Sequence, residues 1–383
     1  MPSSRVPPSR RRVLSAARLP VVLLSVLLAG CAWPGCPAPA PLHQPETLQV
    51  LAERHHVCGV VVAVIRDRQL ASIETASACA PPATLAPDSV FQAASLSKPV
   101  FAYAVLKLVA QGKLDLDTPV MTYLPQGYRH QRNLLTPEPS DLVTDPQLAA
   151  ITIRMVLNHT SGLPNWTSGV LRVGTAPGTT WNYSGEGYVL LQRAVESVTG
   201  QPLDRFMAAQ VFQPLGMNHS DYACNERVAK NLLPGTKANG APRAAMTLTN
   251  PNAAFSLHTS AADYAKFLVA LMNDDALLTQ STASPVAVDP ALGISWGLGW
   301  GMERGRDDAT IWHWGNNTGY RAFAMASVRS GDGFVMLTNS ENGLELAPPL
   351  AQKILPRQHT VFQSPILGTD LLNVLCNTLR ICL

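Results

Sequence analysis

The chain has 383 residues, 46% of them hydrophobic, and a mean hydropathy of +0.08, so it is long and apolar enough to bury a large core. This excludes a disordered chain and a small disulfide scaffold. Charged residues make up only 14%, against about 25% in an average soluble domain, and there is no run of five like charges, which argues against nucleic-acid binding. The net charge of +3 comes from five arginines in the first thirty residues; without them 24 basic residues face 26 acidic ones.

Residues 1–30 predict a signal peptide for export. The arginines precede an apolar stretch from Leu19 to Ala29, which is shorter than the roughly 20 residues needed to span a bilayer, and small residues then lead to Cys31. This order resembles a bacterial lipoprotein signal. The resemblance implies cleavage before Cys31, a lipid on its thiol, and a periplasm-facing membrane lipoprotein of the bacterial cell envelope. An ordinary secretory signal with an incidental Cys31 is the alternative, and inner and outer membrane both remain open.

Export makes disulfides among the other six cysteines possible, because disulfides persist outside the cytosol. Cys58 and Cys79 flank two β-rich runs, Val60 to Arg66 and Leu70 to Ala76, which predict a hairpin. The hairpin places the two cysteines opposite each other, so we expect a Cys58–Cys79 disulfide. The other four could pair in three ways or stay reduced: Cys36, Cys224, Cys376 and Cys382. No cysteine or histidine cluster has metal-binding spacing, so we expect no metal.

Further elements follow in chain order. A Pro-rich linker, 31–45, precedes a short helix near Leu48 to Leu51, and the hairpin comes next. A strong helix is predicted from Ser95 to Gln111, ending at Gly112. The middle of the chain is loop-rich with two helical patterns, Tyr188 to Val198 and Leu203 to Val211. Strand patterns return at Trp296 to Met302, Thr310 to Trp314, Arg321 to Val328 and Phe334 to Asn339.

Strands at both ends and helices in the middle predict an α+β fold. We expect one mostly antiparallel sheet, built by both chain ends and flanked by helices, with a mainly helical subdomain inserted. The predicted boundaries are 46–117 and 252–355 for the α/β catalytic region, 118–251 for the insert, and 356–383 for a C-terminal tail. The tail has a possible amphipathic helix over 371–379, with no assigned role.

The first chemical motif is Ser95-Leu96-Ser97-Lys98 at the start of the strong helix. Residues three apart lie on one helix face, so the Lys98 amine can reach the Ser95 hydroxyl. A serine needs an adjacent base to become a nucleophile, and a partly desolvated lysine can be that base. On its own the four-residue pattern is weak, because a capped helix with a solvated lysine has the same sequence.

Two further segments make the pattern specific. Tyr183-Ser184-Gly185 lies in the helical middle, and His313-Trp314-Gly315 lies on a late strand. With Ser95 and Lys98 they resemble, in order, the S-x-x-K, Y-x-N and K/H-x-G signatures of the serine β-lactamase and penicillin-binding-protein superfamily, in its class C-like branch. The segments around Phe91, His159 and Met217 fit the same branch. The resemblance covers roughly Leu48 to Leu350.

The resemblance implies a serine hydrolase that works through an acyl-enzyme without metal or cofactor. Ser95 would be the acylated nucleophile, Lys98 its base, and Tyr183 a general base whose phenolate the lysine favours. The backbone amides of Ser95 and Asn316 would form the oxyanion hole. His313, Gly315 and Gly185 would border the bound substrate.

Two departures from the family pattern bear on the substrate. Gly185 stands where Y-x-N has the asparagine that grips an amide substrate, and His313 stands where typical β-lactamases have a lysine. Both departures argue against efficient β-lactam hydrolysis and leave acylation intact. We therefore expect hydrolysis of esters or of small acyl or amide substrates. We also expect Gly185→Asn to raise turnover of amides relative to esters. Trp312 and Trp314 could narrow the cleft or simply pack on the sheet.

Two alternatives stay open. A D,D-peptidase, D-aminopeptidase or β-lactamase would act on peptide-like cell-wall substrates, and a binding lipoprotein would keep the fold without catalysis. Nucleic-acid partners are not expected, and the oligomeric state is open. Gly293-Ile294-Ser295-Trp296-Gly297 also fits the G-x-S-x-G nucleophile motif, which requires a strand before it and a helix after it. The preceding segment, Val286 to Leu292, reads as a loop and the following one as a strand, so we do not expect Ser295 to be the nucleophile.

Overall fold

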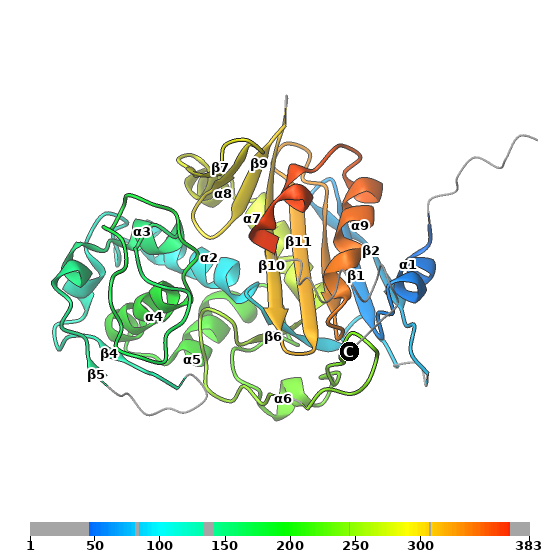
Figure 1. Cartoon of the computed structure of the whole chain (residues 1–383), viewed down its shortest axis with the longest axis horizontal. Helices are drawn as coiled ribbons and strands as arrows, with labels where there is room; N and C mark the ends of the chain where they lie inside the picture. Colours follow the sequence, from blue (N-terminus) through cyan, green and yellow to red (C-terminus); the bar gives the residue numbers. More distant parts are fainter. Residues whose placement is uncertain (1–45, 81–83, 134–140, 245, 306–307, 368–383) are drawn as a thin grey trace, which may run out of the picture. The chain divides into compact units, whose positions relative to one another are not determined.

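A computed structural model describes residues 46–80, 84–133, 141–244, 246–305 and 308–367. Its main feature is an eight-stranded sheet in the order β2-β1-β12-β11-β10-β9-β8-β7, with every neighbouring pair antiparallel (Figure 1). Two strands come from the N-terminal side and six from the C-terminal side, so both chain ends build the sheet, as the sequence predicts. The strands are β1 (Val60–Arg66), β2 (Gln69–Ala76), β7 (Val286–Asp289), β8 (Ile294–Trp296), β9 (Gly301–Arg304), β10 (Ala309–Asn317), β11 (Tyr320–Ser327) and β12 (Gly333–Thr338).

The first hairpin forms where it is predicted. Its turn is only two residues long, because Asp67 and Arg68 both adopt positive φ, at 47° and 60°. Such a turn matches the twist of the paired strands, and it lets β2 begin at Gln69. The Cys58–Cys79 disulfide is confirmed, with the two Cα atoms 4.6 Å apart.

Three sequence predictions about the late strands are wrong in detail. The strand expected from Trp296 to Met302 is two strands, β8 and β9, because the chain turns between them with Gly299 at a φ of 89°. The segment expected to be a loop before it contains β7. The strand expected to end at Trp314 is longer, because β10 continues through Asn317, which pairs with Tyr320 of β11.

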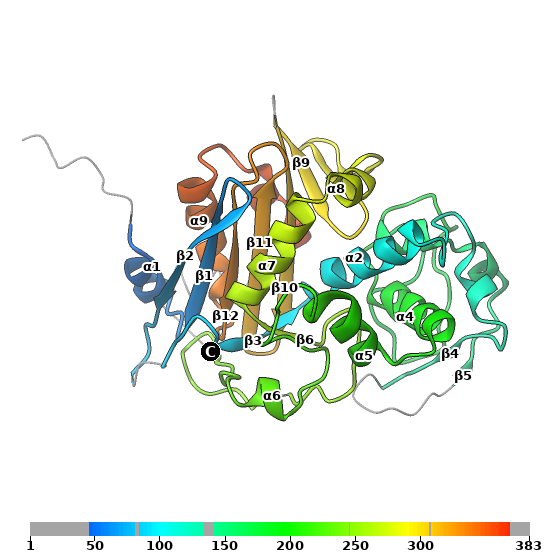
Figure 2. The same cartoon turned by 180° about the vertical axis from the view of Figure 1, so that it is seen from behind.

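Helices cover both faces of the sheet. Helix α7 (Ala261–Met272) packs on β1, β2 and β12 and lies in front of the sheet in Figure 2. Helices α1 (Leu48–Arg54) and α9 (Ala347–Ile354) lie on the opposite face (Figure 1). Strand side chains alternate between two separate apolar clusters: Ile311 joins the cluster that contains α7, and Trp312 joins the one that contains α1 and α9.

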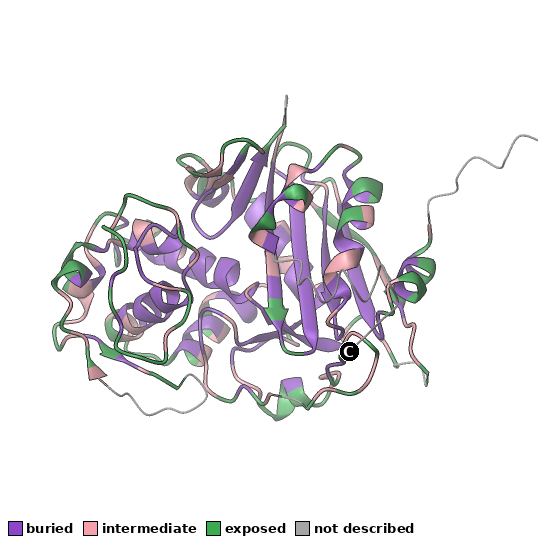
Figure 3. Ribbon diagram, in the orientation of Figure 1, coloured by how far each residue is buried: buried purple, intermediate pink, exposed green. Residues whose placement is uncertain are grey.

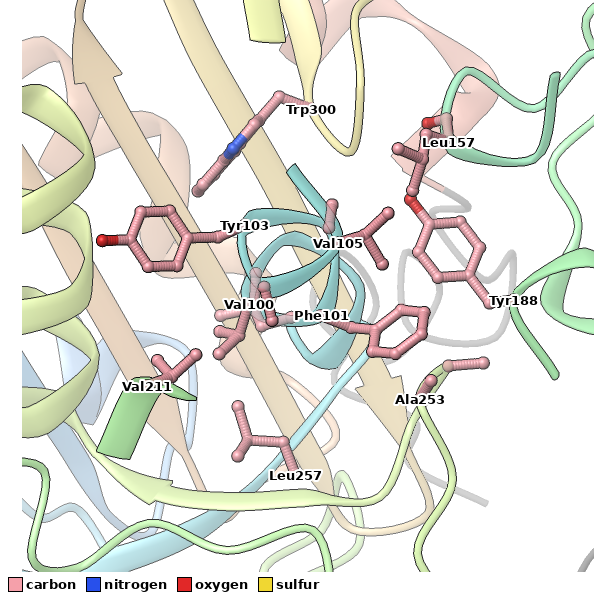
Figure 4. Close-up of a cluster of buried hydrophobic side chains, with 14 of the residues drawn as sticks. Val100, Phe101, Tyr103, Val105, Leu157, Tyr188, Val211, Ala253, Leu257 and Trp300 are labelled. Carbon is pink, nitrogen blue, oxygen red and sulfur yellow. The ribbon is translucent and has the colours of Figure 1, made fainter. Parts of the chain in front are cut away.

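Among the described α-helices, α2 (Ser97–Ala110) has the largest buried share, with 11 of its 14 residues buried (Figure 3). Apolar side chains surround it on every side; Figure 4 shows Phe101 next to Tyr188 and Val100 next to Leu257. It begins two residues later than predicted, so Ser95 lies in the turn before the helix. This helix carries Lys98 into the core.

The remaining elements surround α2. Strand β3 (Val90–Ala94) pairs with β6 (Leu257–Ser260), and β4 (Arg129–His130) pairs with β5 (Asp141–Leu142); none of the four was predicted. The helices are α3 (Ile153–Leu157), α4 (Gly185–Thr199), α5 (Leu203–Met207), α6 (Glu226–Ala229) and α8 (Asp275–Thr282), with a π-helical turn at Ala208–Phe212 and 3-10 turns at Val120–Tyr123, Pro146–Ala150, Gly343–Leu346, Thr360–Gln363 and Pro365–Leu367. The predicted limits of the helical insert stay a prediction.

The described part of the tail folds back onto the sheet. Buried Glu303 of β9 accepts hydrogen bonds from His359, from the backbone N–H of Val361 at 3.1 Å and from Arg357 at 3.3 Å. The helix predicted over 371–379 lies outside the described residues, as do Cys31, Cys36, Cys376 and Cys382. Cys224 is a half-buried free thiol. No helix in the described ranges is both long and apolar enough to cross a membrane.

Candidate active site

Ser95 lies in a tight turn between strand β3 and helix α2. The preceding residue, Ala94, has a φ of 50°, a left-handed conformation that a side chain other than glycine rarely adopts. The turn is fixed from within, because the Ser97 hydroxyl donates to the Ala94 carbonyl at 2.6 Å and accepts from the Leu257 N–H at 2.9 Å. The half-buried Ser95 hydroxyl is therefore held at a strained corner, which is a common property of functional sites.

Lys98 is the nearest base to that hydroxyl. Its Nζ lies 3.1 Å from Oγ of Ser95 and donates to the Ala254 carbonyl at 2.9 Å. The whole lysine is buried, and burial holds the pKa of its amine well below the ordinary value of 10.5. The lowered pKa raises the share of neutral amine, whose lone pair can receive the Ser95 proton.

Tyr183 stands on the other side of the lysine, with Nζ 4.6 Å from the centre of its ring. Burial raises the pKa of its phenol, and the neighbouring Ser95 hydroxyl offsets only part of that rise. The phenol oxygen is buried and does not reach the geometry of a full hydrogen bond. The direction of this shift favours the neutral phenol over the phenolate that the resemblance implies, and Lys98 lies nearer to the Ser95 hydroxyl as a base.

His159 is a site residue that the sequence reasoning did not single out. Its ring centre lies 4.3 Å from that of Tyr183. Its Nδ1 accepts the N–H of Ser184 at 3.1 Å, and its carbonyl accepts the N–H of Asn182 at 2.8 Å. Burial and Lys98 lower the pKa of the imidazole, which is therefore neutral. These two hydrogen bonds hold the residues on both sides of Tyr183, so His159 positions the tyrosine.

Strand β10 brings the third motif alongside the Ser95 turn. A Cβ atom on Gly315 would lie 2.3 Å from the Ala93 carbonyl oxygen, so only glycine lets β10 approach β3 this closely. Asn316, whose backbone amide the resemblance implies for the oxyanion hole, follows Gly315 directly on this strand. Asn317 then donates from its side-chain amide to Gln92 at 2.9 Å and secures the contact.

His313 lies on the same strand face as Gly315 and is fully buried. Its Nδ1 lies 2.8 Å from the Trp314 carbonyl, an acceptor, so Nδ1 carries the ring proton. Burial, together with the nearby Lys98, lowers the pKa of His313 to about 3. The residue is neutral at physiological pH and supplies no cation. Trp312 is buried in the apolar cluster on the other strand face. Half-buried Trp314 packs against the same cluster and on Tyr183, with ring centres 5.1 Å apart.

Gly185 opens helix α4 two residues after Tyr183, and the Trp166 ring covers it. A Cβ atom on Gly185 would lie 2.3 Å from Cη2 of Trp166. The ring therefore occupies the space that the family's asparagine side chain would enter. Sequence reasoning noticed the missing asparagine but not the tryptophan, which is 19 positions away and is brought in by loop packing.

The structure thus brings Ser95, Lys98, Tyr183, His313 and Gly315 together, with Gly185 at the edge. Ser295 lies on β8 between β7 and β9 in an antiparallel meander. A strand does precede it, contrary to the sequence prediction, but no strand-to-helix turn presents its hydroxyl. Across the described ranges there is no group of three or more histidine, cysteine or acidic residues arranged to hold a metal ion.

Comparisons with known proteins agree with this site. Residues 46–358 match the Beta-lactamase family. Penicillin-binding protein 4 of Amycolatopsis lactamdurans is 29% identical over 338 residues, covering 78% of this chain and 84% of that protein. Esterase EstB of Burkholderia gladioli is 34% identical over 169 residues, covering 36% of this chain and 40% of the esterase.

The fold agrees as well. A solved class C β-lactamase superposes with a TM-score of 0.67 at 19% identity, covering 81% of this chain and 94% of that one. The family match spans the three motifs, and the structure gathers them at one place. The chain belongs to the Beta-lactamase family, within the serine β-lactamase and penicillin-binding-protein superfamily, and is a serine hydrolase.

Proposed function

We propose that this protein is an exported hydrolase that cleaves esters through an acyl-enzyme on Ser95. The observation that carries the proposal is the 3.1 Å contact between Ser95 Oγ and the amine of Lys98, a lysine whose pKa is lowered by complete burial. A serine beside a neutral amine is an activated nucleophile. The intact set of Ser95, Lys98 and Tyr183 also argues against a binding lipoprotein without catalysis.

The chemistry follows from the positions of these groups. Ser95 Oγ attacks the ester carbonyl carbon as its proton passes to Lys98, and the backbone amides of Ser95 and Asn316 stabilise the negative oxygen of the tetrahedral intermediate. The C–O bond to the alcohol breaks as Tyr183 gives the leaving oxygen a proton, which Lys98 then returns to Tyr183. Water releases the acid by the reverse sequence, again with Lys98 as base.

Two features favour esters over β-lactams and peptides. His313 is neutral because its pKa is lowered to about 3, so it cannot attract a substrate carboxylate as a lysine would. Gly185 offers no side-chain amide to a substrate amide. An alcohol is also a better leaving group than an amine. The local similarity to Esterase EstB supports this choice.

A D,D-peptidase is the second candidate, and the long match to a penicillin-binding protein favours it. It predicts a preference for peptides that end in D-amino acids, which carry a carboxylate. The neutral His313 disfavours such substrates. A panel of short-chain esters, D-amino acid amides and penicillins therefore separates the two candidates.

The test compares wild type with Ser95→Ala and Ser295→Ala. Loss of the nucleophile should lower ester turnover by about 10⁵-fold or more, whereas Ser295→Ala should change it little. Mass spectrometry after fluorophosphonate treatment should place the adduct on Ser95. An adduct on Ser295, or faster hydrolysis of penicillins than of esters by the wild type, would overturn the proposal.

A further inference from the structure

Trp166 covers the place where the family pattern has an asparagine, and this bears on which acyl group the enzyme accepts. The ring is 39% exposed, one of the few large apolar side chains of the described surface to be so. Its six-membered ring rests on Gly185, and its centre lies 5.5 Å from that of Phe255 in an edge-to-face arrangement. Stable aromatic pairs commonly have this geometry.

Both supports of the ring are parts of the active site. Gly185 follows Tyr183 by two residues. Phe255 follows Ala254, whose carbonyl holds Lys98, and the Phe255 carbonyl lies 3.3 Å from the side-chain amide of Asn317 on β10. Trp166 therefore bridges the segment that carries Tyr183 and the loop that binds the catalytic lysine. Its partly exposed side chain therefore lies beside the two segments that hold Tyr183 and Lys98.

The loop that carries Trp166 is fixed to the start of helix α4. The N–H of Gly185 donates to the carbonyl of Asn165 at 3.1 Å, and the Ser184 hydroxyl donates to the Pro164 carbonyl at 2.9 Å. On the other side of the tryptophan, the N–H of Thr167 donates to the buried carboxylate of Glu186 at 3.0 Å. Hydrogen bonds on both sides of residue 166 hold its ring in place.

We propose that Trp166, together with Gly185 and Phe255, forms an apolar wall that selects esters whose acyl group carries a flat, apolar substituent such as a phenyl ring. An asparagine at position 185 would offer hydrogen bonds to a substrate amide, whereas the wall offers an aromatic surface. A phenyl group placed there loses its hydration and gains contacts with two rings. This inference rests on the proposed ester hydrolysis and names its acyl specificity.

The wall also changes the expectation for position 185. Gly185→Asn alone should not raise amide turnover, because the new side chain collides with the indole. A substitution at Gly185 forces the ring to swing outward, since the colliding atoms lie at the far end of the Trp166 side chain. Only the pair Gly185→Asn with Trp166→Ala leaves room for an asparagine in the position of the family pattern.

The first experiment varies the acyl group while the leaving group stays fixed as p-nitrophenol. Wild type should prefer phenylacetyl over acetyl esters in kcat/KM, and Trp166→Ala should reduce that ratio about tenfold. Trp166→Phe should keep most of it. Val170→Ala is the matched control, because Val170 is an exposed apolar residue of the same stretch, 59% exposed, and should leave the ratio unchanged.

A double-mutant comparison tests the contact itself. Gly185→Ala should lower the phenylacetyl preference as Trp166→Ala does, and the combined variant should lower it no further, because both changes remove the same wall. Additive losses would show that the two residues act separately. A second series varies the alcohol on a fixed acetyl group; a preference for aromatic alcohols that depends on Trp166 would contradict the acyl-side placement.

Fluorophosphonate labelling of Ser95 separates this inference from the proposed function. A wild type that is labelled and cleaves esters, with an acyl preference that Trp166→Ala does not change, overturns the wall and leaves ester hydrolysis intact. A wild type that is not labelled and cleaves no ester overturns both.

Discussion

Lys98 has a function that conflicts with folding. Its amine is buried with two hydrogen-bond partners, so the folded protein releases a proton that the unfolded chain would hold up to pH 10.5. The conformation that makes the lysine a base is therefore one that the folded state maintains at a cost in stability. Catalytic groups commonly show this conflict.

Replacement of Lys98 by methionine tests this cost without an activity assay. Because the folded pKa is lowered, the unfolded state binds more protons between that pKa and 10.5, so the free energy of unfolding contributed by Lys98 rises with pH in that window, by up to about 1.4 kcal/mol per pH unit. Lys98→Met removes the term. Urea denaturation at several alkaline pH values should show that Lys98→Met has the higher free energy of unfolding. Its advantage over wild type should shrink as pH rises. A difference independent of pH would contradict a lowered pKa.

His159 acts on the reaction through Tyr183. It has a φ of 60°, and its Nδ1 accepts a hydrogen bond from the N–H of Ser184. Asparagine tolerates this φ and has a side-chain oxygen that can accept, whereas leucine has neither property. We expect His159→Leu to lower kcat by roughly 10- to 100-fold, with a smaller change in KM, because misplacement of a catalytic group by about 1 Å has effects of that size. His159→Asn should retain more of the activity. Equal losses in the two variants would rule out the positioning role.

At the scale of elements, the Cys58–Cys79 bond joins the two ends of the first hairpin across a sequence separation of 21 residues. Closing a loop of this size stabilises a protein by about 3 kcal/mol, mainly by restricting the unfolded chain. The double variant Cys58→Ala with Cys79→Ala should have a free energy of unfolding lower by about 3 kcal/mol, and its denaturation midpoint should fall accordingly. Ester turnover below the transition should persist, because the catalytic groups lie on other segments. Cys224→Ala, which removes a free thiol, is the control and should change stability little.

Some of the helices and strands could be predicted from the sequence and others could not. The first hairpin, α2 and the core of the late strands follow from long apolar patterns, and each forms close to its predicted limits. Strands β3 and β6 escaped prediction because they are short and wholly buried, so no alternation of polar and apolar residues marks them. The split between β8 and β9 depends on a positive φ at Gly299, which periodicity does not reveal.

The site divides in the same way. Ser95 and Lys98 are predictable because a single turn joins them, and the Tyr183 and His313 motifs are recognisable as a set. The pKa directions are not predictable, because they depend on burial by segments far apart in the sequence. For the same reason the sequence shows Gly185 but not the Trp166 ring above it, a contact that only the folded loop creates.

For the whole molecule, export and anchoring through Cys31 stay a prediction that the described residues do not cover. If Cys31 carries the lipid, Cys31→Ser should leave the protein uncleaved or soluble rather than membrane-associated, with unchanged ester turnover. Metabolic labelling with a fatty-acid precursor and cell fractionation measure this. Lipid labelling that persists in Cys31→Ser would refute the assignment, and secretion with cleavage in both forms would indicate an ordinary signal.

The pairing of β1 with β12 has a consequence for how the protein is made. Val60 sits opposite Thr338, so the first hairpin joins the rest of the sheet only after β12 has been synthesised. Contacts this distant in sequence form slowly, because a long loop must be ordered first. Until then one edge of the valine-rich strand β1 lacks its partner β12 and is prone to pair with another chain. The nascent polypeptide should therefore remain unfolded long enough to need a chaperone, and early termination anywhere before β12 should produce aggregates rather than an active fragment.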